Sequence, residues 1–395
     1  MAVGDRMVAG GDALAHQPDG RVLFVSGALP GERVRAEVTE RSRDWARAVT
    51  TEVIVASPER VHPPCPSAAR GCGGCQWQHV ATTVQATLKA AVVVDALRRL
   101  GRREEPDVVV GAAVPPDRYR TTVRLDVDAD GRPSYHRRGD RTLVAPDHGC
   151  GVAHPRLAEL IVDGRFPGAT RVGLRVGVAG GERLALPTGG IDRRSVRVPA
   201  GTVVVDPDGR ASVHEQVAGR SWRISARSFF QSGPAAAGLL VAAVERAAVG
   251  ALGEGVIDLY GGVGLLGGSL VARHGGSLWS VDADPDACGD AETNLADLAA
   301  RVVRAEVGSW RPPHAGPAAA LVVADPARPG LGRPGVAAVA AIDAPVVVLV
   351  SCDPASLGRD VALLAATGYE LGRVEVLDLF PHTVHVETVA RFERR

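Results

Sequence analysis

From about residue 234 onward, short apolar runs alternate with segments in which apolar residues recur at helical spacing. The apolar runs cover residues 255–260, 278–282, 320–325 and 345–351. This β–α alternation predicts a mostly parallel, doubly wound sheet, and therefore an α/β fold class for this part of the chain. Because the carboxyl ends of the strands in such a sheet line the ligand crevice, the residues that follow these runs are the first candidates for chemistry.

The preceding residues have a different pattern. A length of 395 residues predicts two or three domains. Alternating apolar and polar positions over residues 1–57 predict short strands and a small β-barrel of the oligonucleotide-binding type, although another small β domain fits the same pattern. Residues 80–100 have the apolar spacing of a helix, and valine-rich runs between turns predict mainly strands over 108–225.

The composition sets limits on location and partners. The chain has 45 basic and 45 acidic residues, so its net charge does not indicate a nucleic-acid partner. Lys89 is the only lysine, a bias that we attribute to a GC-rich genome. No apolar stretch is long enough to predict a membrane span, and the first residues do not resemble a signal peptide. We therefore expect a cytoplasmic protein.

A glycine-rich turn follows the first apolar run. Residues 258–264 read Asp-Leu-Tyr-Gly-Gly-Val-Gly, and Asp282 lies 18 residues beyond Gly264, at the end of the next predicted strand. Glycines allow a ligand to approach the backbone, and an acidic residue at this place can accept hydrogen bonds from ribose hydroxyls. Without a following Gly-Lys-Ser/Thr, the turn suits a nucleoside cofactor such as S-adenosylmethionine; a purely structural turn is the alternative.

Reactive side chains follow the later runs. Cys352 comes directly after the run at 345–351, and Asp325 ends the run before it. Residues 380–387, Phe-Pro-His-Thr-Val-His-Val-Glu, are rich in groups able to form a site. This position makes Cys352 a candidate nucleophile, although a cysteine is more commonly a small buried hydrophobe, and Glu387 could be an ordinary charge on an edge strand.

Four other cysteines form a candidate metal site. Cys65, Cys72 and Cys75 cluster in the sequence, and Cys150 follows at a distance. Six cysteines in this length are too few for a disulfide scaffold. The spacing permits structural zinc or an iron–sulfur cluster, whereas Cys288, in a helical stretch, is expected to pack in the core.

Six short motifs extend this interpretation: Cys72-Gly-Gly-Cys75, Phe229-Phe-Gln231, Asp258-Leu-Tyr260, Asp325-Pro, Ser351-Cys352 with Pro354, and Phe380-Pro with His385 and Glu387. In order and spacing they resemble the RNA (uracil-5-)-methyltransferase family, the enzymes that make 5-methyluridine in ribosomal and transfer RNA. The resemblance covers nearly the whole chain.

The resemblance implies three domains. An N-terminal TRAM domain, an OB-like β-barrel, would cover 1–57. A mainly β central domain with an iron–sulfur cluster, which also binds RNA, would consist of 58–76 and 108–220. A Rossmann-like class I methyltransferase domain would consist of 77–107 and 221–395, because the helix near residue 90 packs with the catalytic domain in such relatives.

The resemblance also assigns the chemistry. Cys352 would add to C6 of a uridine, which makes C5 nucleophilic toward the methyl group of S-adenosylmethionine, and Glu387 would then remove the C5 proton. The target base would have to leave its stack to be reached. The remaining predicted cofactor- and uracil-site residues are Gln231, Tyr260, Asp282 and Asp325, with Leu265 through its backbone and Glu306 as an acidic cofactor contact.

By the same resemblance, Cys65, Cys72, Cys75 and Cys150 would hold a 4Fe–4S cluster with a structural role or a role in RNA contact. The expected partner is an RNA substrate, with ribosomal RNA favoured over transfer RNA, and the expected state is a monomer. A catalytically silent RNA-binding protein and a small-molecule methyltransferase are the alternatives, but retention of Cys352 and Glu387 opposes the first and the predicted TRAM-like and cysteine-bearing parts oppose the second.

The chain departs from the family pattern at several places. Tyr260 is followed by Gly-Gly and not by Cys-Gly, and Asp325 by Pro-Ala-Arg and not by Pro-Pro-Arg. Asp353 replaces the usual asparagine beside the nucleophile, and its carboxylate would raise the pKa of the thiol if it pointed inward. The residues expected to contact RNA phosphates or bases are Arg41, Arg43, Trp45, Arg47, Arg118, Arg120, Arg137 and Arg138.

Overall fold

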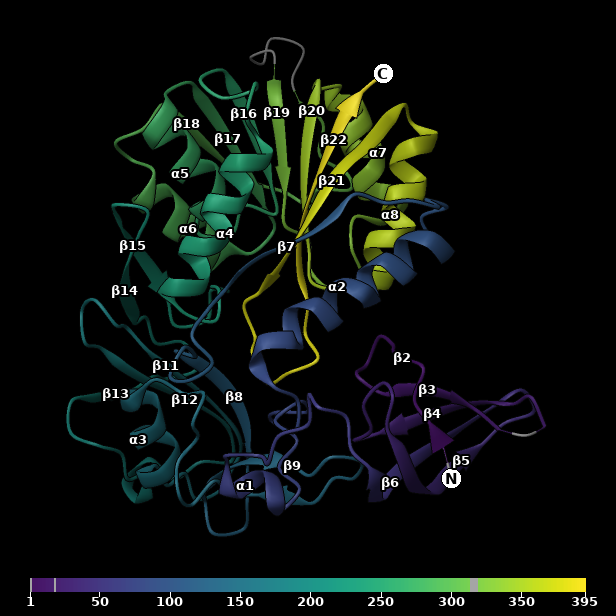
Figure 1. Ribbon diagram of the computed structural model, residues 1–395. Coiled ribbons are helices and arrows are strands. Elements are labelled where there is room, and N and C mark those ends of the chain that lie inside the picture. Colours follow the sequence, from purple (N-terminus) through teal and green to yellow (C-terminus); the bar gives the residue numbers. More distant parts are fainter. Residues whose placement is uncertain (1, 18, 313–318) are drawn as a thin grey trace.

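The computed structural model describes residues 2–17, 19–312 and 319–395 (Figure 1). Figure 1 shows the C-terminal α/β part at the top, with the central β part and the N-terminal β part side by side below it. Among the helices in the described ranges, none combines the length and the apolar composition that crossing a bilayer requires.

The α/β part is built on one sheet of eight strands, in the order β18-β17-β16-β19-β20-β22-β21-β7. The five strands from β18 to β20 are parallel to one another, and β22 runs antiparallel to both of its neighbours. The predicted α/β class is therefore confirmed. The strands are β7 (Val108–Ala113), β16 (Gly255–Leu259), β17 (Ser277–Asp282), β18 (Ala300–Arg304), β19 (Ala319–Ala324), β20 (Val346–Ser351), β21 (Tyr369–Asp378) and β22 (Glu387–Arg394).

Helices cover both faces of this sheet because its central strands are apolar on both sides. In β19, Leu321 and Val323 belong to one buried core, and Val322 and Ala324 to the other. Such continuous apolar runs are typical of strands buried on both faces. One core includes residues of α4 (Pro234–Ala247), α5 (Leu265–His274) and α6 (Pro285–Asn294), and the other those of α2 (Thr82–Arg99), α7 (Gly332–Ile342) and α8 (Pro354–Ala366).

An early segment of the chain completes this part. The predicted helix near residue 90 is α2, which packs against α8 and crosses below the sheet in Figure 1. The strand β7 pairs in parallel with β21 at the edge of the sheet, although the sequence analysis assigned residues from 108 onward to the central segment. The sheet thus takes in six residues more than the predicted range 77–107.

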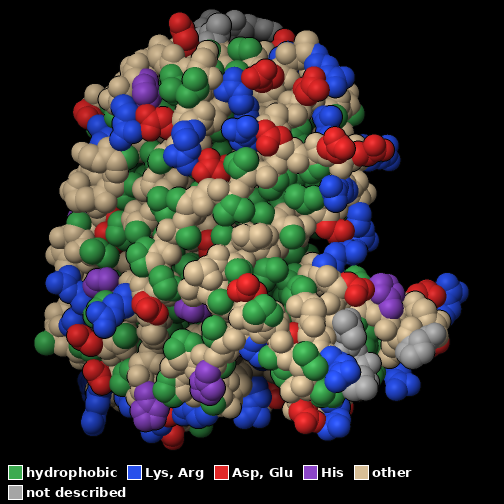
Figure 2. Space-filling model, viewed as in Figure 1, with side chains coloured by type: hydrophobic (Ala, Val, Ile, Leu, Met, Phe, Trp, Pro, Cys, Tyr) green, Lys and Arg blue, Asp and Glu red, His purple; other side chains and the backbone are tan. Residues whose placement is uncertain are grey.

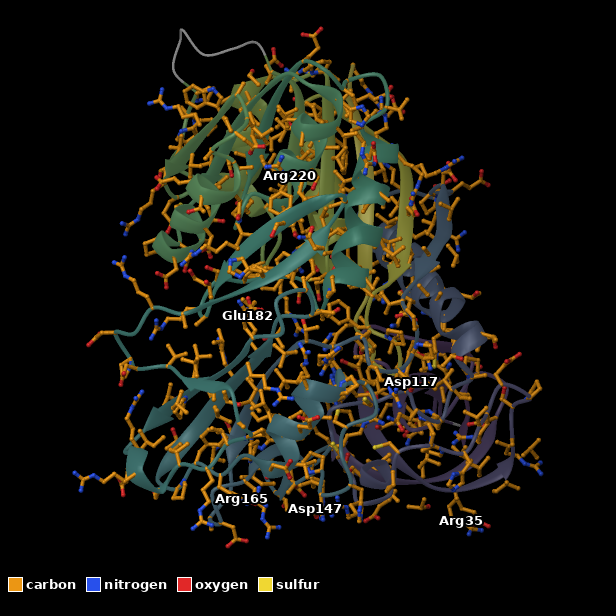
Figure 3. All side chains as sticks on the ribbon, turned by 90° about the vertical axis from the view of Figure 1, so that its left-hand side faces the viewer. Arg35, Asp117, Asp147, Arg165, Glu182 and Arg220 are labelled. Atoms are coloured by element: carbon orange, nitrogen blue, oxygen red, sulfur yellow. The ribbon has the colours of Figure 1, made fainter. Side chains whose placement is uncertain are left out.

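The central part contains a six-stranded sheet in the order β10-β9-β8-β11-β12-β13, packed against α3. A separate hairpin, β14–β15, connects it to the α/β part, where Arg220 donates to Asp297 (2.7 Å). Glu182 of the central part receives a hydrogen bond from His214 of the hairpin (2.7 Å; Glu182 and Arg220 are labelled in Figure 3). The elements are α1 (Pro66–Ala69), β8 (Thr122–Val127), β9 (Pro133–His136), β10 (Leu143–Val144), α3 (Pro155–Asp163), β11 (Ala169–Val176), β12 (Arg183–Gly189), the 3₁₀ turn Arg193–Ser195, β13 (Thr202–Val204), β14 (Ser212–Val217) and β15 (Arg220–Ser225).

The N-terminal part is a six-stranded sheet in the order β1-β5-β6-β4-β3-β2. Its small core also contains Trp77 and Val92, so this part packs directly on the start of α2. The predicted strand-rich organisation of residues 1–57 is observed. The strands are β1 (Ala2–Val3), β2 (Arg6–Met7), β3 (Ala13–His16), β4 (Val22–Ser26), β5 (Arg33–Arg41) and β6 (Trp45–Val55).

Candidate active site

One large cavity opens at the carboxyl ends of β16, β17, β19 and β20, and encloses about 2240 Å³ including its open mouth. Glu306 is the one predicted catalytic or cofactor residue that is not part of its lining. Glu306 lies close enough to Tyr260 to help burial and Asp360 raise the pKa of that hydroxyl. The lining includes the other predicted residues: Gln231, Tyr260, Leu265, Asp282, Asp325, Cys352 and Glu387.

The glycine-rich turn and Asp282 form one end of the cavity. Tyr260 has a positive φ of 61°, and Gly264 at the start of α5 has a φ of 88°, so the chain turns sharply between β16 and the helix. Asp282 accepts hydrogen bonds from the backbone N–H groups of Gly262 (2.9 Å) and Asp284 (2.8 Å). These bonds fix the carboxylate beside the turn, and its remaining lone pairs can accept from ribose hydroxyls.

A second acidic residue, Asp258 of β16, stabilises the same turn from within the protein. It is fully buried and accepts a hydrogen bond from the Gly267 N–H (2.8 Å), which ties the first turn of α5 to β16. Burial is the main cause that raises its pKa to about 7. The sequence analysis gave Asp258 no role of its own, because only its burial distinguishes it from a surface aspartate.

Cys352 and Glu387 are neighbours at the other end of the cavity. Cys352 lies between β20 and α8, and Glu387 is the first residue of β22. The two strands pair antiparallel, with Ser351 opposite Thr388, and the Thr388 hydroxyl donates to the Ser351 carbonyl (2.8 Å). This pairing brings Cys352, which follows Ser351, and Glu387, which precedes Thr388, together where the ladder ends.

The electrostatic environment of Cys352 favours the neutral thiol. Burial, followed by the nearby Glu387 and Asp325, raises the pKa of the thiol to about 11, while Arg328 acts in the opposite direction. Burial also raises the pKa of Asp325 to about 7 and that of Glu387 well above its ordinary value. In the ligand-free site, the Cys352 thiol and the Asp325 and Glu387 carboxyl groups are therefore all shifted toward their neutral, protonated forms.

Asp353, which follows the nucleophile candidate, directs its carboxylate to the start of α8. Its side chain accepts a hydrogen bond from the Ser356 N–H (2.7 Å) and so forms the N-cap of α8. Asp353 is not among the groups that shift the pKa of Cys352. The departure from the family's usual asparagine therefore retains a good capping residue.

Hydrogen-bond donors surround the acidic cluster. The Gln231 amide donates to Asp325 (3.4 Å), and an Arg328 nitrogen lies 3.0 Å from Nδ1 of His385. Burial and the charge of Arg328 lower the pKa of His385 to about 4, so this ring is neutral and accepts from the guanidinium. The sequence analysis gave Arg328 no role, although it lies in the motif that begins at Asp325.

The four cysteines predicted to bind metal also line one cavity, of about 370 Å³, together with Tyr135. None of the four forms a disulfide, and the Tyr135 hydroxyl lies 3.7 Å from Sγ of Cys150. Within the described ranges, no group of three or more His, Cys, Asp or Glu side chains is arranged to hold a metal ion. Tyr135 also lines the large cavity, so the two sites adjoin.

The residues predicted to contact RNA are dispersed. Arg120 lines the large cavity. In the N-terminal sheet, Arg47 lies 3.3 Å from Asp12 and stacks near Trp45, with 5.7 Å to the ring centroid. Arg43 pairs with the adjacent Asp44 (3.1 Å). Most of this set therefore lies away from the cavity that holds Cys352.

Comparisons with known proteins identify relatives of this chain, although no protein-family model matches it. A protein of Streptomyces avermitilis named an uncharacterized RNA methyltransferase is 34% identical, over 97% of this chain and 95% of its own length. A protein of Streptomyces coelicolor with the same description is 35% identical, over 97% of this chain and 90% of its own length.

A solved structure has the same fold. It is the tRNA (uracil-54, C5)-methyltransferase of Pyrococcus abyssi in complex with S-adenosyl-L-homocysteine. The superposition covers 99% of this chain and all of that chain, with a TM-score of 0.73 and 23% sequence identity. This likeness confirms the Rossmann-like methyltransferase fold. Given the identity and coverage of the Streptomyces relatives, the chain belongs to the family of RNA methyltransferases.

Proposed function

We propose that this protein transfers a methyl group from S-adenosylmethionine to C5 of a uridine in RNA. The observation that carries the proposal is the meeting of Cys352 and Glu387 at the end of the β20–β22 ladder, in the cavity that also contains Asp282. A thiol beside a carboxyl group suits covalent addition followed by proton removal. The motif resemblance and the likeness to the tRNA (uracil-54, C5)-methyltransferase of Pyrococcus abyssi both support uracil C5 as the acceptor.

In the proposed reaction, the Cys352 thiol first loses its proton to solvent. The thiolate then forms a bond to C6 of the uracil, and the displaced electron pair moves to the C4 carbonyl oxygen. The resulting enolate attacks the donor's methyl group through C5, and S-adenosylhomocysteine leaves. Glu387 then takes the C5 proton, and the electron pair that this frees re-forms the ring double bond as the C6–S bond breaks. Gln231 and Arg328 line the same cavity and offer donors to the developing negative charge.

The donor would bind at the other end of the cavity. Asp282 is fixed for ribose contact, and the backbone of Leu265 opens α5 beside it. The proposed cofactor set also includes Tyr260, which follows β16, and Glu306, which follows β18 and lies outside the cavity lining. S-adenosylmethionine supplies an electrophilic methyl group and needs no metal for the transfer.

We also propose that Cys65, Cys72, Cys75 and Cys150 hold a 4Fe–4S cluster. The support is their common cavity and a donor set made only of soft thiolates, which suits such a cluster. Their side chains would have to turn toward one another to bind it, because no group of three in the described ranges is arranged to hold a metal ion. A bound cluster would supply a covalent link between the segment at 65–75 and Cys150. Iron and sulfide analysis of anaerobically purified protein, with Cys72→Ser as the comparison, tests this assignment against zinc.

The wider organisation is proposed on the same basis. Residues 1–57 would form a TRAM domain, 58–76 and 114–220 a central cluster and RNA-binding domain, and 77–113 with 221–395 the catalytic domain, which takes in β7. Ribosomal RNA is favoured over transfer RNA as the substrate. The protein is proposed to act as a monomer in the cytoplasm, and size-exclusion chromatography tests the first of these points.

The decisive experiment is tritium release from RNA labelled at uracil C5, with unmodified ribosomal and transfer RNA tested separately. We expect release that requires S-adenosylmethionine and is lost in Cys352→Ala. Glu387→Gln should transfer the methyl group but retain the RNA as a covalent adduct. No release from either RNA, with protein that binds S-adenosylmethionine normally, would contradict the proposal and favour a silent RNA-binding protein.

A further inference from the structure

A second groove runs from the catalytic cavity across the central part. It is lined by β8, β11, β12 and residues 205–207 and 226–230, and encloses about 1980 Å³ including its mouth. The two hollows share Arg124, Arg227 and the exposed Phe229 among their lining residues. A ligand that fills the cavity can therefore continue into the groove without leaving the protein surface.

The groove has an unusual local charge. Five arginines and only one acidic residue line it, although the chain as a whole has equal numbers of basic and acidic residues. Over the face seen in Figure 2, by comparison, blue and red side chains are interspersed. The charged residues in the groove lining are Arg124, Arg171, Arg175, Arg193, Arg227 and Asp206.

The sheet register explains how these charges reach one surface. In β11, Val172 and Leu174 point into the core beneath α3, so Arg171 lies on the opposite face. In the neighbouring strand β8, Leu125 points into the same core, which leaves Arg124 on the face of Arg171. One face of this mainly antiparallel sheet therefore packs on α3, and the other presents arginines to the groove.

These guanidinium groups are available to an anion. Within the described residues, Arg124 is exposed and has no ion pair, and Arg227 donates to backbone carbonyls such as that of Asp206 (2.7 Å), which leaves its charge uncompensated. Arg171 and Arg193 pair with Asp126 (2.9 Å) and Asp206 (2.6 Å). Both arginine side chains are about half exposed, and exposed pairs of this kind are weak enough to exchange for a phosphate.

An aromatic ring stands where the groove meets the cavity. Phe229 is 71% exposed, whereas the adjacent Phe230 is buried. A large exposed aromatic side chain beside guanidinium groups is the combination on which single-stranded nucleic acids bind, with bases on the ring and phosphates on the cations.

We propose that this arginine groove (Arg124, Arg171, Arg193 and Arg227) binds the single-stranded RNA that flanks the nucleotide in the catalytic cavity. The inference rests on the proposed function for the identity of that nucleotide. The flanking phosphates contact the arginines, and a neighbouring base packs against Phe229. This surface is separate from the RNA contacts that the sequence indicated, because those seven arginines and Trp45 do not line the groove.

The test is RNA binding measured apart from catalysis. Fluorescence anisotropy with a labelled single-stranded RNA of about 15 nucleotides would compare the wild type with Arg171→Gln/Arg193→Gln over a range of salt concentrations. Each lost phosphate contact should reduce the slope of log K against log salt by about 0.7, and the double variant should bind about tenfold more weakly at low salt.

Arg273→Gln is the matched control, since Arg273 is a half-exposed arginine in an ion pair with Glu245, at the end of α5 remote from the cavity. It should bind RNA as the wild type does. In methyl transfer, the double variant should raise the KM for RNA and leave kcat unchanged, because Arg171 and Arg193 lie outside the catalytic cavity.

The outcomes separate the two proposals. An unchanged affinity and salt slope in the double variant, with wild-type methylation intact, would overturn the groove alone. Weakened binding by a protein that releases no tritium would support the groove and overturn the uracil assignment. Equal displacement of RNA by polyglutamate would show a general anion site and overturn the assignment to RNA.

Discussion

The reactivity of Cys352 with an alkylating reagent tests the electrostatic description of the active site directly. In the protein without ligands, burial and the neighbouring carboxyl groups raise the pKa of this thiol from its ordinary 9.0 to about 11. Alkylation proceeds through the thiolate. We therefore predict that Cys352 reacts slowly at neutral pH, although we assign it as the nucleophile.

The magnitude follows from the two pKa values. At pH 8 a thiol with a pKa of about 11 has about one hundredth of the thiolate of a thiol with a pKa of 9.0. A more basic thiolate is intrinsically more nucleophilic, which returns a factor of about 6 to 10. Cys352 should therefore alkylate about 10 to 15 times more slowly than the thiol of a short unstructured peptide.

The assay is iodoacetamide labelling over pH 7–10.5, with the peptide that contains Cys352 quantified by mass spectrometry. The rate should still rise at pH 10, where that of the reference peptide has levelled off. Asp325→Asn removes one negative neighbour and should move the inflection to lower pH, because the thiolate is then less disfavoured. A wild-type rate that levels off below pH 9, or equals that of the peptide, would refute the reasoning.

Three further changes test other parts of the structure. Lys89→Met leaves the buried Asp378 without its partner at 2.7 Å and should lower the free energy of unfolding by about 3–5 kcal/mol, whereas Lys89→Met/Asp378→Leu should recover most of the loss in thermal unfolding. Asp282→Ala should weaken S-adenosylmethionine binding about 10- to 100-fold by calorimetry, and wild-type affinity would exclude the ribose role. Gly268→Ala places a Cβ against the Leu295 side chain and should cost about 1–3 kcal/mol of stability; an unchanged melting temperature would show that this contact relaxes freely.

The sequence was most informative where function depends on the order of residues along a strand. The apolar runs predicted which residues end each strand, and this places Cys352, Asp325 and Asp282 at one edge of the sheet. Glu306 follows β18 in the same way, yet it does not line the cavity, because side-chain direction after a strand depends on the loop and not on the run.

Features that combine distant segments of the chain could not be predicted from local sequence patterns. The arginine groove joins β8, β11, the 3₁₀ turn at Arg193–Ser195 and Arg227, and no local pattern connects them. The place of β7 at the sheet edge depends on its pairing with β21, more than 250 residues later, so the boundary near residue 107 could not be fixed from local spacing. Whether the Asp353 side chain caps α8 or turns toward the thiol depends on its rotamer, which the sequence does not specify.

The pairing of Lys89 with Asp378 has a consequence for how this protein is made. The two residues are separated by 289 positions, and Lys89 also donates to the Phe380 carbonyl (3.0 Å). At a synthesis rate of about 5–20 residues per second, α2 leaves the ribosome about 15–60 s before its buried partner exists. During that interval the ammonium group must stay in water, so the helix cannot take its final place. The catalytic part is thereby committed to folding after almost the entire chain has been translated, while the N-terminal sheet is free to form first.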